Sequence, residues 1–169
     1  MAKNKHLFWI TGLPGSGKTT IAKKIHKKIE KKYGPTIEIS GDELRKNFLL
    51  NKYDIKNREE YAKFYSKFCK ALIKKNINVI FSTVSLFHKV QNWNRKHIDG
   101  YFEIFVKSDV KKIIKLNKKK IYKNKKNLVG VNLNAEFPKK PDLKIFNSFN
   151  KNTKEISDEL LKQIFKKLK

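Results

Sequence analysis

Eight consecutive residues near the N-terminus have the composition of a phosphate-binding loop. Residues 12–19 match the pattern G-x-x-x-x-G-K-[ST]. Glycines let backbone N–H groups turn inward around an anion, and the start of the following helix adds partial positive charge. Lys18 is expected to reach the β- and γ-phosphates of a nucleoside triphosphate, and the Thr19 hydroxyl is expected to hold Mg²⁺. The residues predicted to bind the donor phosphates are Gly12, Leu13, Pro14, Gly15, Ser16, Gly17, Lys18, Thr19 and Thr20.

A second group of polar residues lies between positions 42 and 58. Asp42 follows a short predicted strand, where its carboxylate can accept a proton from a substrate hydroxyl or hold Mg²⁺ through water. The alternative is that Asp42 caps the next helix. Only three of the 41 basic residues are arginines, so Arg45 and Arg58 stand out as phosphate ligands. Tyr53 lies between them and can stack on a base, or it is a surface aromatic that closes a loop.

The surrounding sequence predicts the elements that position these groups. The apolar run at 7–10 is typical of a buried parallel strand, and apolar residues recur at helical spacing over 18–32. Further strands are expected at 36–40, 78–81, 101–106 and 143–146, and further helices at 43–50, 57–75, 89–96, from 108 and at 153–168. The inner side of the helix at 57–75 is expected to carry Tyr61, Phe64, Tyr65, Phe68, Leu72 and Ile73. This alternation predicts an α/β fold with a five-stranded parallel sheet flanked by helices. Ligands of such sheets bind beyond the carboxyl ends of the strands, so the site is expected there.

Residues 117–141 break the pattern. They are rich in Lys and Asn, contain Gly130, Pro138 and Pro141, and show no clear period. A loop this long in a compact domain is usually functional, so we expect a lid over the site. The alternative is a passive basic insertion.

Length, apolar runs and cysteine content narrow the classes of protein to which the chain can belong. The 169 residues favour a single domain over 1–169, and no apolar run reaches the 18 residues of a membrane span. Without a signal peptide and with a lone cysteine, Cys69, the chain is expected in the cytoplasm. The helix pattern predicts that Cys69 is buried as a small apolar residue.

The net charge of +26 raises the alternative of a basic nucleic-acid-binding protein with a vestigial P-loop. The lysines are spread along every predicted helix instead of gathering on one stripe, and Lys, Asn and Ile are abundant together, as an A+T-rich coding sequence produces. The intact loop and Asp42 also argue against such a binder. The expected partners are therefore a nucleoside triphosphate and a small anionic nucleotide, and not nucleic acid.

The chain resembles the adenylylsulfate (APS) kinase family over about residues 7–147. Enzymes of this family use ATP to phosphorylate the 3′-hydroxyl of adenosine 5′-phosphosulfate. The segments that carry the resemblance are Phe8-Trp9-Ile10-Thr11-Gly12 with the loop, Gly41-Asp42-Glu43-Leu44-Arg45, Ile121-Tyr122-Lys123 and Lys126 to Pro138. The resemblance implies a P-loop kinase fold, Mg²⁺ and a possible homodimer. It implies catalytic roles for Asp42 and Lys18. The acceptor-binding residues that it implies are Arg45, Tyr53, Arg58, Ser85, Lys126 and Val131. Ser85 stands at the serine of the family's S-P-Y motif, which is sometimes assigned as a carrier of the phosphoryl group. We expect direct in-line transfer instead, with a positioning role for Ser85.

Several positions depart from the family pattern. They are Ser40 for the first Asp of D-G-D, Tyr61 for an acceptor-binding Asn, Phe64 for an Arg, Leu86 for a Pro, Leu128 for the aromatic lid residue, and Leu116 and Asn117 for an R-D pair near the donor base. The residues for phosphoryl transfer match the family, whereas several residues of the acceptor side and one pair on the donor side differ. This pattern is typical of a paralogue whose nucleotide substrate has changed. One such relative is the cytidine diphosphoramidate kinase of capsule modification. We therefore expect a cytidine diphosphate derivative as acceptor and ATP or GTP as donor, with ordinary adenylylsulfate kinase as the alternative.

Overall fold

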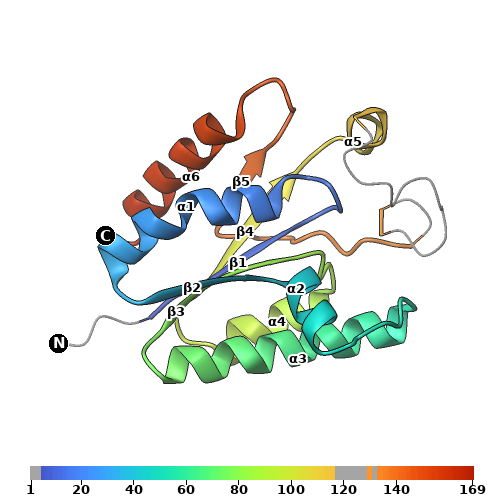
Figure 1. The fold of residues 1–169 in the computed structure, drawn as a ribbon, viewed down its shortest axis with the longest axis horizontal. Coiled ribbons are helices and arrows are strands. Elements are labelled where there is room, and N and C mark those ends of the chain that lie inside the picture. The colour runs from blue at the N-terminus through green and yellow to red at the C-terminus, as the bar shows by residue number, and fades with distance from the viewer. Residues whose placement is uncertain (1–4, 117–128, 131–132) are drawn as a thin grey trace.

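The computed structural model describes residues 5–116, 129–130 and 133–169 (Figure 1). Five parallel strands form one sheet in the order β2-β3-β1-β4-β5. Their bounds are β1 Leu7–Gly12, β2 Thr36–Ser40, β3 Asn78–Thr83, β4 Tyr101–Lys107 and β5 Leu143–Phe146. Every residue of the central strand β1 is buried, as its continuous apolar run predicts.

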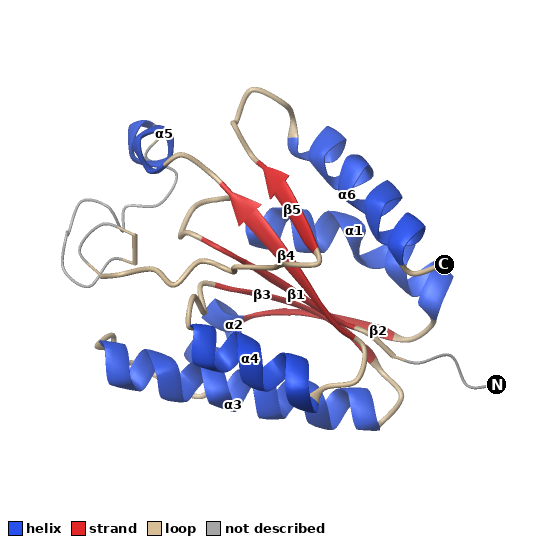
Figure 2. Cartoon of the chain, turned by 180° about the vertical axis from the view of Figure 1, so that it is seen from behind, coloured by secondary structure: helices blue, strands red, loops and turns tan. Residues whose placement is uncertain are grey.

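Helices cover both faces of this sheet. On one face lie α1 (Lys18–Tyr33) and α6 (Thr153–Lys167), and on the other lie α2 (Gly41–Asn47), α3 (Ile55–Lys74) and α4 (His88–His97). Figure 2 shows α5 (Val110–Lys115) beyond the end of β4. Ile21, Ala22, Ile25 and Ile29 of α1 are fully buried against the first face, as their helical spacing predicts.

The predicted elements are confirmed, with two corrections. The helix predicted over 43–50 is α2, Gly41–Asn47. It begins at Gly41 because the Ser40 hydroxyl accepts a hydrogen bond from Glu43 N and caps it. Phe64 was expected on the inner side of α3 but is 37% exposed, since the buried stripe of that helix runs through Ala62, Tyr65, Ser66 and Cys69. The burial predicted for Cys69 is confirmed. Within the described ranges, no helix combines the length and the apolar composition needed to cross a membrane.

All five strands point the same way, so their carboxyl ends share one edge of the sheet. The P-loop leaves this edge after β1, α2 begins there after β2, and residues 84–87 follow β3. This edge is where an open parallel sheet binds its ligands.

Candidate functional site

The P-loop turns tightly between β1 and α1. A Cβ at Gly12 would lie 2.4 Å from the backbone oxygen of Val106 on β4, and Gly12 has a φ of +153°. The loop therefore needs glycine at this position to pass so close to the neighbouring strand. Ser16 N donates to the oxygen of Leu13 at 3.1 Å, and Ile21 N donates to the oxygen of Gly17 at 3.0 Å as α1 begins.

Lys18 and Thr19 lie at the start of α1, where the sequence predicts the donor phosphates. Lys18 is only 6% exposed, and its Nζ donates to the oxygen of Leu13 at 2.7 Å. The Thr19 hydroxyl lies 3.2 Å from the hydroxyl of Ser82 at the end of β3. Thr20 is exposed on the same first turn of the helix. The ammonium group is thus held over the loop, beside the backbone that would surround an anion.

The chemistry of the hydroxyl pair fits Mg²⁺. In the part of the chain that the structure describes, no three His, Cys, Asp or Glu side chains come together as a metal-binding group. Mg²⁺ bound to a nucleotide takes most of its ligands from phosphate oxygens and water, and needs few protein oxygens. Thr19 and Ser82 offer two such oxygens next to the loop.

A polar residue after β5 also reaches the P-loop. The side chain of Asn147 is 4% exposed, and its Nδ2 donates to the backbone oxygen of Ser16 at 3.0 Å. Its Oδ1 accepts a hydrogen bond from Phe149 N at 3.0 Å. The loop is therefore connected to the fifth strand as well as to β4.

Asp42 lies in the first turn of α2, at the same edge of the sheet. Its side chain is exposed, and the cap of this helix is Ser40, so the alternative that Asp42 serves as the cap is wrong. Gly41 next to it packs closely, because a Cβ there would lie 3.0 Å from Thr83 Oγ1. The hydroxyl of Tyr65 donates to the oxygen of Gly41 at 3.3 Å, and burial raises the pKa of this phenol far above its usual range. A neutral donor thus fixes the backbone that carries Asp42.

The two predicted phosphate-binding arginines lie together around Tyr53. The Arg45 guanidinium lies over the Tyr53 ring, with 3.9 Å between Cζ and the ring centroid, and the Arg58 guanidinium lies 5.5 Å from the same centroid. Arg58 Nε donates to the oxygen of Tyr53 at 2.6 Å, and Arg45 Nε donates to the oxygen of Leu50 at 3.3 Å. Tyr53 itself is 53% exposed. The loop at 50–53 therefore holds both arginines through its backbone.

Electrostatics at this cluster favour an anion. Burial lowers the pKa of the Arg58 guanidinium, and the positive charge of Arg45 lowers it further, while the nearby carboxylate of Asp42 raises it. Arg45 Nη2 is buried and has no hydrogen-bond partner among the described residues. An anionic ligand would offset the repulsion between the two cations and pair with that N–H group.

Ser85 lies in the segment after β3. It is 6% exposed, its Oγ lies 2.9 Å from Thr83 Oγ1, and its N–H donates to the same oxygen at 3.3 Å. Thr83 also lies against Gly41, so Ser85 is connected through one side chain to the turn that carries Asp42.

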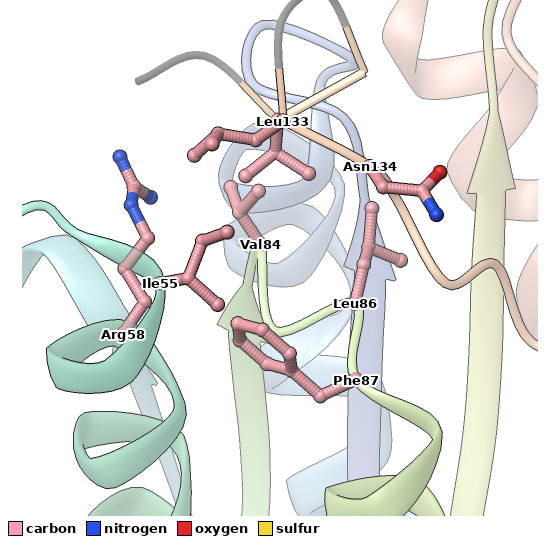
Figure 3. Close-up of a pocket in the computed structure, with 8 residues that line it drawn as sticks. Ile55, Arg58, Val84, Leu86, Phe87, Leu133 and Asn134 are labelled. Carbon is pink, nitrogen blue, oxygen red and sulfur yellow. The ribbon is translucent and has the colours of Figure 1, made fainter.

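A small pocket opens beside these groups. Figure 3 shows Arg58 and Ile55 of α3 facing the segment after β3, with Leu133 above them. The lining side chains are mainly apolar: Ile55, Arg58, Val84, Leu86, Phe87, Val129, Leu133 and Asn134. An apolar pocket with a cation at its rim suits a flat ring that carries a charged tail.

The described part of the predicted lid is anchored to the body of the protein. A Cβ at Gly130, which has a φ of +85°, would lie 2.4 Å from Leu13 Cδ2, so this turn packs directly on the P-loop. Glu136 N donates to the oxygen of Leu86 at 3.2 Å, and the Glu136 carboxylate accepts from His88 N at the start of α4. The segment from 133 onward is therefore a fixed wall of the pocket.

Most of the predicted site residues thus come together at one edge of the sheet. Thr19 contacts Ser82, and Thr83 contacts both Ser85 and Gly41 beside Asp42, while Arg45, Tyr53 and Arg58 pack on one another. Lys126 and Val131, like Leu128 and Asn117, lie outside the described residues. Sequence reasoning missed Ser82, Asn147 and Glu136. Ser82 directly follows the strand predicted at 78–81 but received no role, and the residues after the strand predicted at 143–146 were not considered as site residues, although position after a strand was the signal for both.

Comparison with known proteins agrees with this geometry. The family model for adenylylsulphate kinase matches residues 4–146. The cytidine diphosphoramidate kinase of Campylobacter jejuni is 35% identical to this chain, and the alignment covers 97% of this chain and 99% of that protein. The adenylyl-sulfate kinase of Thermodesulfovibrio yellowstonii is 29% identical, and the alignment covers 96% of this chain and 85% of that protein. The structure of Mycobacterium tuberculosis APS kinase in complex with AMPPNP and APS superposes with a TM-score of 0.85 at 22% identity, covering 96% of this chain and 98% of that one, which shows the same fold. The chain therefore belongs to the adenylylsulphate kinase family and is a kinase of the P-loop type.

Proposed function

We propose that this kinase transfers the γ-phosphoryl group of ATP or GTP to the ribose 3′-hydroxyl of a cytidine diphosphate derivative, cytidine diphosphoramidate. The observation that carries the proposal is the similarity to the Campylobacter jejuni kinase, which extends over 97% of this chain and 99% of that protein at 35% identity. A role in capsular polysaccharide modification is part of the same proposal, as is a homodimer, which sedimentation analysis would test.

The described side chains can perform the transfer with little covalent chemistry. Lys18 would stabilise the γ-phosphoryl group as charge spreads over its oxygens, and the P-loop N–H groups would hold the β-phosphate. Asp42 would accept the proton that leaves the acceptor hydroxyl. Thr19 and Ser82 would hold Mg²⁺, which neutralises phosphate charge when bound. Ser85 would orient the Asp42 turn through Thr83 and would form no covalent intermediate.

The acceptor would lie between the P-loop and α3. Arg45 and Arg58 would bind its diphosphate end, together with Lys126, and the apolar pocket beside Arg58 would take the base. Lys126 and Val131 enter only through the family resemblance. The pocket is small and its lining is mainly apolar, and the family resemblance places Leu128 where the family has the aromatic lid residue. Loss of that ring favours a pyrimidine over a stacked purine.

The second candidate is an ordinary adenylylsulfate kinase. The family model and the relative from Thermodesulfovibrio yellowstonii favour it. A panel of purified enzyme with two donors, ATP and GTP, and two acceptors, cytidine diphosphoramidate and APS, separates the two candidates. We expect the higher kcat/KM with the cytidine nucleotide, and a phosphate on its ribose 3′-oxygen by phosphorus NMR. A higher kcat/KM for APS with ATP would overturn the proposal.

The remaining class, a nucleic-acid binder with a vestigial P-loop, is tested by gel shift. Such a protein would bind long oligonucleotides with a steep dependence on salt concentration. We expect only weak binding of this kind, because the loop, Asp42 and both arginines are arranged for a small anionic ligand.

A further inference from the structure

We infer that Asn147 is a positioning residue of the donor site, whose side-chain amide orients the P-loop for nucleotide binding. The inference concerns the donor phosphates, so it does not depend on which acceptor the enzyme uses. It rests on the contacts of one buried side chain that follows β5.

The backbone of Asn147 is fixed to the sheet. Its N–H group donates to the oxygen of Lys107 at 2.9 Å, which extends the pairing of β4 with β5 by one residue. The side chain is 4% exposed. A polar side chain this deeply buried stabilises the fold only if its donor and acceptor atoms are both paired.

Both atoms of the amide are paired, and in one orientation only. Oδ1 accepts from Phe149 N, so it must be the oxygen, and Nδ2 donates to the backbone oxygen of Ser16, so it must be the nitrogen. A flipped amide would place oxygen against oxygen and N–H against N–H. The turn at Phe149 therefore selects the orientation that presents a donor to the P-loop.

The contact with the Ser16 oxygen controls the direction of an N–H group in the loop. In a trans peptide the oxygen of one residue and the N–H group of the next point in opposite directions within one plane. When Asn147 holds the Ser16 oxygen on its side, the N–H group of Gly17 points to the other side, away from Asn147. In a P-loop, inward N–H groups of this kind bind the donor phosphates.

The close approach also limits residue 17. A Cβ at Gly17 would lie 2.9 Å from Asn147 Nδ2, and Gly17 has a φ of +93°, which other residues rarely adopt. Asn147 thus packs against the peptide that it orients, and the strand end and the loop form one unit.

Two substitutions separate this role from simple stabilisation of the turn. Asn147→Asp keeps an acceptor for Phe149 N but removes the donor to Ser16, whereas Asn147→Ala removes both hydrogen bonds. Ser148→Ala is the matched control, because the Ser148 hydroxyl accepts from Asn150 N at 3.4 Å within the same segment. We would measure the Kd of ADP and of GDP by titration calorimetry, the melting temperature, and the KM for the acceptor.

We expect both Asn147 variants to raise the nucleotide Kd about tenfold, the effect of about 1.4 kcal/mol. The acceptor KM should change less than twofold, and Ser148→Ala should bind nucleotide like the wild type. An unchanged Kd in Asn147→Ala, with only a lower melting temperature, would overturn the inference. A Kd raised in Asn147→Asp but unchanged in Asn147→Ala would also overturn it, since repulsion between the new carboxylate and the phosphates would then be the cause. If Asn147→Ala does not fold, the Kd of Asn147→Ser decides in its place, because this variant carries no charge and lacks the amide that donates to Ser16.

Discussion

The guanidinium of Arg45 lies over the ring of Tyr53, with 3.9 Å between Cζ and the ring centroid. The ring that the sequence predicts as a stacking surface for the acceptor base is therefore in contact with a cation in this structure. Arg58 approaches the same ring and donates to the Tyr53 oxygen. Tyr53 is thus the residue that brings two like charges together, and its ring offsets part of their repulsion.

Removal of this ring should weaken acceptor binding. Tyr53→Ala should raise the acceptor KM about tenfold, because a cation–π contact is worth about 0.5–2 kcal/mol and Arg45 would lose its support. Tyr53→Phe keeps the ring and should stay within about twofold of wild type, since twofold is only about 0.4 kcal/mol. Steady-state kinetics at saturating donor tests this, and equal KM values for Ala and Phe would show that the ring has no such role.

Substitution of Lys18 is the strongest test of the role of the P-loop in phosphoryl transfer. Lys18→Ala should lower kcat by roughly three orders of magnitude, the scale of losing one electrostatic stabiliser of the transition state. The melting temperature should change little, because the ammonium group contacts the loop and not the apolar core. A variant that keeps a tenth of wild-type turnover would contradict the role of Lys18 in transfer.

Asp42 can be tested without disturbing its helix, because Ser40 is the cap of α2. Asp42→Asn should therefore keep the fold and lower kcat at least a hundredfold, the lower end of general-base effects. Nucleotide affinity should change much less. Ser40→Ala is the complementary control, since it should lower stability by about 1 kcal/mol through the lost cap. Full activity in Asp42→Asn would exclude a role as base.

The thiol of Cys69 should be unreactive in the folded protein. Burial raises the pKa of this thiol far above its usual range, so the nucleophilic thiolate is scarce at neutral pH, and reagent cannot reach a side chain with no exposed surface. A thiol-specific dye should label the native enzyme very slowly and label the unfolded chain at once. Rapid labelling of native protein would mean that α3 opens readily from the sheet.

The sequence predicted the sheet because each strand is a short apolar run and each connecting helix shows its own period. It also placed Asp42, Arg45 and Arg58 near the P-loop, because residues after parallel strands share one edge. It could not show that Arg45 contacts the Tyr53 ring, because this contact depends on the rotamers of both side chains. It also could not show that the Asn147 side chain reaches the backbone oxygen of Ser16, because the two residues are far apart in sequence. The inner face of α3 was misplaced at Phe64 because aromatic residues occur on both sides of that helix.

Tyr61 provides a test of specificity within the acceptor site. Its hydroxyl accepts from Lys52 N at 3.3 Å, and its ring lies 5.9 Å from Arg45 Cζ, so it supports the same loop and the same arginine as Tyr53 does. The family resemblance places an asparagine at this position. If the proposed acceptor is correct, Tyr61→Asn should lower kcat/KM for cytidine diphosphoramidate about tenfold, equivalent to about 1.4 kcal/mol, and should leave kcat/KM for APS unchanged or higher.

The matched control is Tyr61→Phe, which keeps the ring beside Arg45 and loses only the hydroxyl contact. Since Lys52 N is exposed and can bind water instead, Tyr61→Phe should keep most of the wild-type kcat/KM for the cytidine nucleotide. The deciding quantity is the ratio of kcat/KM for the two acceptors, because a general loss of stability would lower both values together. A ratio that is the same in wild type, Tyr61→Phe and Tyr61→Asn would show that Tyr61 does not select the acceptor.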